Sequence, residues 1–319
     1  MAVTVIIASG AAAEKIDGRT VLQNMMESEK SAIYIANEVT YINESKELTS
    51  EQTIYHSGIT GNRIEYTSPA KLKGMVMADN GTQSVFYNPK IKKMTIGPSW
   101  LSMMKGHKWS QPPMLPGEPT PEIKGIETIA GRRAYVVEIK PPFGQQRYRK
   151  LWIDKEKWVH LKTEELTNNG EVKSRSFFKK IKFVKSIPAS RFTVKLGHDI
   201  KVEQMPGPVF LTIDQARNAV KFRIIQPSYL PKGFKPVGAA VFPFRGGKIA
   251  GIRYTDGVNA FTIFQSQQTA LEPGFLKRLH YGPIRSGGGI YSWRNGNLNL
   301  TIVGRISSDE IHKISDSMR

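Results

Sequence analysis

The feature of this sequence that most constrains its fold is an alternation of apolar and polar residues that starts at Ile33. Ile33, Ile35, Val39 and Tyr41 fall on one side of an extended segment, as in a strand with one face toward an apolar interior. Turn residues such as Asn80-Gly81 separate later runs. Short strands joined by tight turns pair antiparallel, so an antiparallel meander is predicted. Its further strands are residues 62–67, 75–78, 83–87, 92–96, 123–129, 134–139, 148–154, 160–166 and 172–184.

Helical signals are few in this half of the chain. Asp17 is placed to cap a short helix that carries Val21, Leu22, Met25 and Met26 on one face. A second helical turn is expected at 100–104, before a proline-rich loop. Few helices among many strands predict a sheet-dominated fold of the α+β class.

The chain has 319 residues, which fits two domains better than one. A capping box at Thr212 and Gln215 starts a helix, five strands follow, and Ser308 is expected to cap a last helix. The sequence therefore predicts a signal-peptide remnant at 1–13, a first domain at 14–195, a Gly- and Pro-containing linker at 196–208, and a smaller α+β domain at 209–319.

The first residues have the pattern of an export signal. Residues 2–8 are apolar, and the small residues 9–13 end in Ala11-Ala12-Ala13, just before Glu14. This arrangement is typical of an h-region followed by an A-x-A cleavage site. The alternative is an N-terminal strand. The stretch is shorter than the roughly 20 apolar residues that span a bilayer. We therefore expect an exported protein, periplasmic or otherwise extracytoplasmic, that is peripheral to the membrane at most.

The charge and cysteine content narrow the partner classes. The chain carries 46 Lys and Arg against 27 Asp and Glu, a formal net charge of +19. This charge favours acidic partners, and it is equally consistent with a solvated basic surface. There is no cysteine, which excludes disulfides, thiolate metal ligands, a cysteine nucleophile and a lipidated-cysteine anchor.

Catalytic and metal-binding motifs are weak. The six histidines are scattered, and no H-E-x-x-H occurs. Ser102-Met103-Met104-Lys105 spells S-x-x-K, but the chain has no K-T-G partner motif. We therefore predict a protein that is not an enzyme and binds no cofactor or metal.

Several segments resemble one family in their order along the chain. Residues 130–137, with Gly131-Arg132 and Ala134-Tyr135, are similar to an "AGR-x-AY-V" strand pair, and 148–154 to a "YR-x-LWID" strand. Residues 229–234 match a "YLP-x-GF" segment near the start of the second domain. Together these segments resemble the sigma-E regulatory proteins RseB and MucB. Trp158-Val159-His160 departs from the Gly-Leu-Pro usual there.

The resemblance implies both a fold and a function. The first domain would be a LolA-like half-open antiparallel β-barrel, with helices in or over an apolar cavity. The protein would bind the extracytoplasmic domain of a membrane anti-sigma factor and so regulate an envelope-stress sigma factor. Acyl chains or lipoproteins would be sensed in the cavity. The alternative function is a periplasmic lipoprotein or lipid carrier of the LolA type.

Two sets of site residues follow. Met and Trp side chains form an adaptable apolar surface, although those near 100–109 could instead plug a core. The expected cavity lining is Ile35, Val39, Val76, Phe86, Trp100, Met103, Met104, Trp109 and Trp152. A basic run with interleaved phenylalanines could mimic a nucleic-acid surface, but export disfavours that partner. The expected partner-binding residues are Arg149, Lys173, Arg175 and Lys179.

Overall fold

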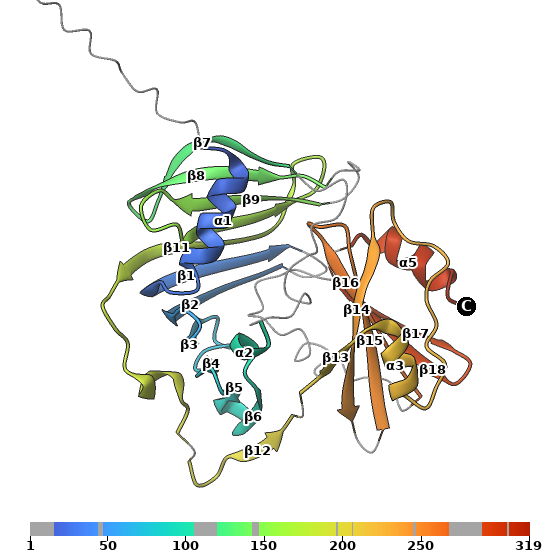
Figure 1. Ribbon diagram of the computed structural model, residues 1–319. Helices are drawn as coiled ribbons and strands as arrows, with labels where there is room; N and C mark the ends of the chain where they lie inside the picture. Colours follow the sequence, from blue (N-terminus) through green and yellow to red (C-terminus); the bar gives the residue numbers. More distant parts are fainter. Residues whose placement is uncertain are drawn as a thin grey trace, which may run out of the picture.

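The computed structural model describes residues 16–43, 47–104, 120–141, 147–195, 197–205, 207–244, 247–267, 289–304 and 306–319. Within these ranges the strands form a sheet of twelve and a sheet of six. Figure 1 shows the two sheets side by side, each with its own helices. The expected α+β class, a large antiparallel sheet followed by a smaller one, is confirmed.

The large sheet is open, because its strand order runs from β12 at one edge to β7 at the other. All neighbours pair antiparallel except β12 and β6, which are parallel. The order is β12 (Lys201–Gln204), β6 (Lys93–Pro98), β5 (Gln83–Asn88), β4 (Val76–Asp79), β3 (Gly61–Ser68), β2 (Glu47–Ser57), β1 (Ile33–Asn43), β11 (Val172–Phe183), β10 (His160–Leu166), β9 (Tyr148–Asp154), β8 (Arg132–Ile139) and β7 (Pro121–Ile129).

β1 lies at the middle of the large sheet and fixes which face is buried. Its even-numbered residues from Tyr34 to Thr40 are buried, with Tyr34 2% and Ala36 1% exposed. These two side chains share a core with residues of the neighbouring strands, including Ile54, Ile64 and Phe178. Ile35 and the other odd-numbered residues are half-buried or exposed on the opposite face. The alternation was therefore predicted correctly, but the buried side is the one that carries Tyr34.

One helix packs across the face of the large sheet that holds this core. α1 (Gly18–Ser28) is capped by Asp17, which accepts a hydrogen bond from the Thr20 amide. Val21 is completely buried and packs against Val137 and Ile153 of β8 and β9. Figure 1 shows α1 crossing the strands from β8 toward β1. The predicted cap is confirmed, and so is the predicted apolar face, except that Met26 is 46% exposed.

Short helical elements complete the first part of the fold. α2 (Trp100–Met104) follows β6, η1 (Pro89–Ile91) joins β5 to β6, and η2 (Ala189–Phe192) follows β11. Phe192 packs against Gly61 of β3, where a β-carbon would lie 2.4 Å from its ring. The glycine thus allows the segment after β11 to lie on the sheet.

The smaller sheet has its own core. α3 (Ile213–Ala219) begins with the predicted capping box of Thr212 and Gln215. α5 (Ser308–Asp316) is capped by Ser307, one residue before the expected Ser308. Core residues include Ile252, Ile263, Leu300, Ile302 and Ile311. The strand order is β13 (Val209–Leu211), β14 (Lys235–Phe244), β15 (Gly247–Thr255), β16 (Ala260–Ser266), β18 (Leu298–Gly304) and β17 (Gly289–Asn295).

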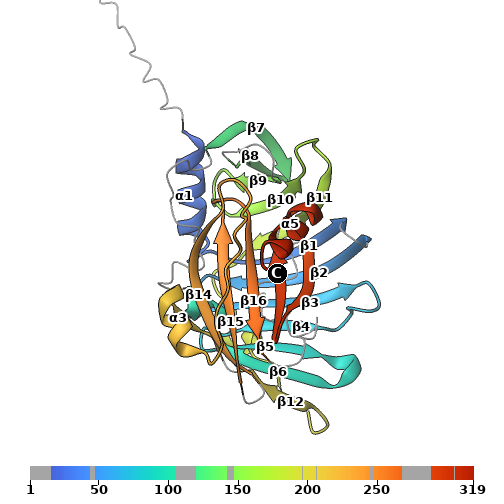
Figure 2. The same ribbon diagram turned by 90° about the vertical axis from the view of Figure 1, so that its right-hand side faces the viewer.

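The two sheets touch near the start of β9. Asn259 donates a hydrogen bond of 2.9 Å to the backbone oxygen of Arg147. Figure 2 shows the smaller sheet in front of the large one when the molecule is seen from that side. β12 lies within the predicted linker and pairs with β6, so the chain extends the large sheet before it enters the small one. No helix in the described ranges is long and apolar enough to cross a bilayer.

Candidate functional site

The residues expected to line an apolar cavity are distributed over both faces of the large sheet. Trp152 is 3% exposed and belongs to the core with Tyr34, and Phe86 packs against that core. Val76 is buried but pairs with Tyr87, whereas Phe86 pairs with Met77. Because neighbours along a strand point to opposite faces, Val76 and Phe86 face opposite ways.

Ile35 and Val39 lie on the β1 face opposite Tyr34, where they are half-buried. They are therefore on a different face from Phe86, which packs against the Tyr34 core. The described members of the predicted cavity set do not form one continuous lining. The cavity assignment stays a prediction, centred on the Trp100 region.

Trp100 is half-buried at the start of α2. The helix is held by Asp79, a completely buried carboxylate that accepts hydrogen bonds from the Ser99 hydroxyl at 2.7 Å and the Leu101 amide at 3.2 Å. Burial raises the pKa of Asp79. The Met103 and Met104 side chains and all of Trp109 lie outside what the structure describes. Asp79 therefore fixes the segment that presents Trp100.

Trp152 is held by polar contacts at its ring edge and face. Its indole nitrogen donates to Glu127 at 2.7 Å, and the Lys162 ammonium lies 3.8 Å from the ring centroid. A cation over an aromatic face is attractive when it is partly desolvated. This setting favours a structural role for Trp152 in the core.

Each of the expected partner-binding cations is close to a carboxylate, which lies on a neighbouring strand, in the adjoining turn or, for Lys179, on β2, two strands away. The nitrogen–oxygen distances are 2.5 Å for Lys173–Glu171, 2.6 Å for Arg175–Glu164, 3.2 Å for Lys179–Glu51 and 3.6 Å for Arg149–Glu165. These four cations are therefore neutralised locally. It is a surface of mixed charge, which suits a protein partner better than a polyanion.

The strand register divides these four cations between two faces. Arg175 pairs with Glu164, which in turn pairs with Lys150. Arg149 pairs with Glu165, one residue further along β10, and so points the other way. Lys150 lies 3.5 Å from Glu138, which continues a row of alternating charge from β11 to β8. Arg175 belongs to this row, whereas Arg149 faces the side of α1.

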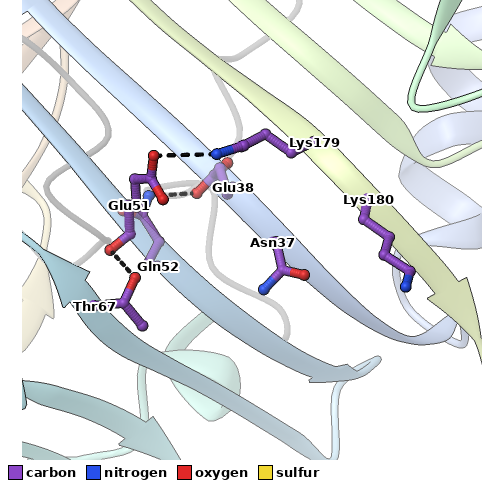
Figure 3. A pocket seen from close by; sticks show the side chains of 7 residues that line it. All are labelled: Asn37, Glu38, Glu51, Gln52, Thr67, Lys179 and Lys180. Atoms are coloured by element: carbon purple, nitrogen blue, oxygen red, sulfur yellow. Dashed lines mark hydrogen bonds and ion pairs between the residues drawn. The ribbon is translucent and has the colours of Figure 1, made fainter.

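A polar hollow between β11, β1, β2 and β3 was not foreseen. Figure 3 shows its lining, which comprises Asn37, Glu38, Glu51, Gln52, Thr67, Lys179 and Lys180. Its volume is about 300 Å³. Of the residues expected to bind a partner, only Lys179 lines it. No sequence pattern predicts the hollow, because one of its walls, β11, lies far along the chain from β1, β2 and β3.

A histidine–carboxylate cluster was also missed. Glu29, just after α1, lies 2.7 Å from the His160 ring nitrogen and 3.5 Å from that of His56. Burial alone would raise the pKa of Glu29. Contact with His160, and to a smaller extent with His56, instead lowers this pKa to about 2. Tyr34 stacks on His56 with ring centroids 4.7 Å apart. Within the described ranges, no group of three or more His, Asp and Glu side chains is placed to hold a metal ion.

A large open antiparallel sheet with a helix across one face, continued by a smaller sheet, defines a class of two-sheet α+β proteins that includes MucB. Residues 17–196 match the family model described as the MucB/RseB N-terminal domain. The chain belongs to the MucB/RseB family. No curated protein sequence matches it significantly.

Solved structures share this architecture. MucB in complex with MucA(peri) superposes with a TM-score of 0.60 and 15% identity, over 95% of this chain and 98% of that one. The Pseudomonas aeruginosa MucA/MucB complex gives a TM-score of 0.58 and 15% identity, over 94% and 97%. Over both sheets, the fold is thus that of MucB.

Proposed function

We propose that this protein is an extracytoplasmic regulator that binds the extracytoplasmic part of a membrane anti-sigma factor and thereby controls an envelope-stress sigma factor. The observation that carries the proposal is membership of the MucB/RseB family. The match to MucB extends over both sheets, and that MucB was crystallised with MucA(peri). The proposed role is binding without catalysis.

The charged row on β11, β10 and β9 supports a protein partner. Its ion pairs are partly exposed, with 41% of the Arg175 side chain and 54% of the Lys179 side chain accessible. An exposed pair such as Lys179–Glu51 contributes only about 0–1 kcal/mol. An acidic side chain of a partner can therefore replace Glu51 at little cost, whereas Glu164, whose side chain is 9% exposed, keeps Lys162 at 3.0 Å when a partner carboxylate engages Arg175. Lys173 and Arg175 share this face, whereas Arg149 would contact a partner that reaches the junction with the second sheet.

The test is a binding titration between the purified protein and the extracytoplasmic segment of the membrane anti-sigma factor encoded in the same genome. The double variant Arg175→Glu, Lys179→Glu should bind about tenfold more weakly or worse, because like charges then face each other. Lys221→Glu, an exposed residue of the second domain, makes the matched control and should change affinity little.

The two parts of this proposal fail separately. If the unaltered protein does not bind the segment, the regulatory function is wrong. If it binds but the double variant binds equally well, only the assignment of the surface is wrong.

Lipid or lipoprotein sensing near Trp100 is the finer part of the proposal, and the LolA-type carrier is its alternative. Support comes from a half-buried tryptophan presented by α2 next to an open sheet, since ligand sites combine apolar walls with concave surfaces. Mass spectrometry of the native protein should reveal co-purified acyl chains. Acyl chains without affinity for the anti-sigma segment would favour the carrier.

Export is the proposed location, with the mature chain starting near Glu14. The small residues before this position suit signal peptidase. Amino-terminal sequencing of the protein from its native cells should begin close to Glu14. Recovery of an intact Met1 would contradict export by this signal.

A further inference from the structure

The polar hollow in Figure 3 lies where two neighbouring ladders are interrupted. The pairing of β1 with β11 shifts between Asn37 and Glu38, and that of β2 with β3 shifts between Glu51 and Gln52. A bulge bends a strand and redirects its side chains. Two bulges on either side of the β1–β2 pair open a space of about 300 Å³ in the sheet.

The sheet beneath this hollow is rigid and polar, because a hydrogen-bond network on its buried face joins β1 to β2. Glu38 is 2% and Gln52 4% exposed. The Gln52 amide nitrogen donates to the Glu38 carboxylate and to the Thr40 hydroxyl, both at 2.8 Å. The Ser50 hydroxyl donates to the Gln52 carbonyl oxygen at 3.2 Å. These bonds fix the sheet before any ligand arrives, which lowers the entropic cost of binding.

The rim retains unused hydrogen-bonding groups. The Asn37 amide nitrogen donates to the Thr53 hydroxyl at 3.2 Å, and Figure 3 shows its carbonyl oxygen on the side of Lys180. Lys180 is exposed, and its ammonium has no partner among the residues the structure describes. Lys179 and Glu51 pair across the rim at 3.2 Å. The rim thus offers one uncommitted donor group, one uncommitted acceptor and one replaceable ion pair.

The lining determines the chemical class of ligand. Two glutamates and two lysines balance in formal charge, so the hollow has no preference for an anion or a cation. No apolar or aromatic side chain lines it, which excludes an acyl chain. A hydroxyl group both donates and accepts hydrogen bonds, and so matches a rim that offers both kinds of group at once. The volume is at the lower end of the range of about 300–1,000 Å³ for small-molecule sites.

We propose that this hollow binds a neutral sugar, either a free monosaccharide or the terminal unit of a glycan. This site adjoins the proposed anti-sigma surface, with which it shares Lys179 and Glu51, but its rim residues Asn37 and Lys180 lie outside that surface; it is separate from the Trp100 region. The sugar hydroxyls would accept from Lys180 and donate to the Asn37 carbonyl oxygen, with the backbone of β1 and β2 beneath the ring. Two or three such bonds give weak, millimolar-range affinity, which is sufficient for recognition of a polymer that presents many copies.

The experiment is saturation-transfer NMR and titration on the full chain with defined probes. These are glucose and N-acetylglucosamine as neutral sugars, glucuronate as an anionic one, glucosamine as a cationic one, and chitotriose as an oligosaccharide. Neutral sugars should bind and charged ones should bind more weakly. Tighter binding of chitotriose than of the monosaccharides would identify a glycan end as the natural ligand. Equal binding would identify a free sugar.

Variants at the exposed rim keep the test independent of folding. Lys180→Ala and Asn37→Leu should each weaken neutral-sugar binding about tenfold with an unchanged melting temperature. Lys182→Ala, an exposed lysine on the same strand and outside the hollow, is the matched control and should bind as the parent does. Absence of neutral-sugar binding, binding of glucuronate alone, or unaltered binding by both rim variants would each overturn the proposal.

Discussion

The Glu29 carboxylate and the His160 imidazole, 2.7 Å apart, join the end of α1 to β10 across 131 residues of sequence. His160 also donates its backbone amide to the same carboxylate at 3.2 Å. On the other side of Glu29, the His56 ring nitrogen lies 3.0 Å from the Glu29 backbone oxygen. α1 is thus attached to two strands that lie on opposite sides of β1.

Removal of the Glu29 charge should loosen this attachment. Glu29→Gln leaves two ring nitrogens with weaker partners in a half-buried site, and should lower the free energy of unfolding by about 1–3 kcal/mol. Urea denaturation measures the effect. Glu27→Gln, on the same helix with its side chain 74% exposed, is the control and should change stability by less than about 0.5 kcal/mol.

The same contact predicts an acid dependence of stability. The pKa of Glu29 falls from 4.5 to about 2 on folding, so the folded state binds this proton less readily than the unfolded state. The ionised Glu29 therefore contributes at most about 3 kcal/mol to the free energy of unfolding. This contribution is complete above about pH 4.5 and is lost as the pH falls through 2. Denaturation curves between pH 5 and 2 should converge for the parent and Glu29→Gln. Parallel curves over this range would contradict the prediction.

Asp154 explains why the two strand motifs that identified the family occur together. It is completely buried and accepts hydrogen bonds from the Arg132 guanidinium and from the backbone amides of Glu156 at 2.9 Å and Lys157 at 2.7 Å. Burial alone would raise the pKa of Asp154, but Arg132 and these amides keep this pKa below its usual value. The arginine of the first motif and the aspartate of the second are one interaction.

Asp154→Ala should therefore be among the most damaging single changes in the large sheet. It leaves Arg132 without its buried partner and two turn amides unsatisfied, for an expected loss of about 3–5 kcal/mol. Glu156→Ala removes the other Arg132 partner, which is 79% exposed, and should cost under about 1 kcal/mol. Thermal melting of both variants measures the difference, and equal effects would contradict the assignment.

The sequence predicted most strands because local signals define them. Asn168-Asn169-Gly170 turns the chain between β10 and β11, and Gly170 adopts the positive φ of 81° that such a turn requires. β2 was missed because its alternation is carried by polar residues, including the buried Gln52 and Ser50. Their burial depends on a hydrogen-bond network with β1, which no local pattern reveals.

The candidate sites were harder to predict, since they depend on pairing between distant segments. Ile35 and Val39 were chosen for their apolar character, yet a one-residue offset decides the face of a strand. The hollow at Asn37 and Lys180 exists only because two ladders shift register. Glu29 and His160 are each unremarkable polar residues until the fold brings them together.

The predicted division at 196–208 leads to a proteolysis experiment. Lys195 is exposed and follows η2 without entering a strand, whereas Lys201 begins β12, which pairs with β6. Backbone held in a sheet resists proteases, so limited trypsin treatment should cut first after Lys195. A first cut within β9, β10 or β11 would show that the predicted division of the chain at 196–208 is wrong.

The role of the Trp100 region is decided by placing a charge at Met103 in α2. If an open apolar cavity surrounds this position, water reaches the carboxylate of Met103→Asp in the empty protein, and stability falls only modestly. An acyl chain would be opposed strongly, by about 0.8 kcal/mol for each CH₂ that stays in water. If the position is a sealed core, the variant should instead lose several kcal/mol of stability or fail to fold.

Thermal melting and fluorescent fatty-acid binding are therefore measured on the same variant. Ile91→Asp, at a side chain 63% exposed, is the control. A Met103→Asp protein that melts normally and binds the probe as tightly as the parent would remove α2 from the cavity, and one that fails to fold would place α2 in the core.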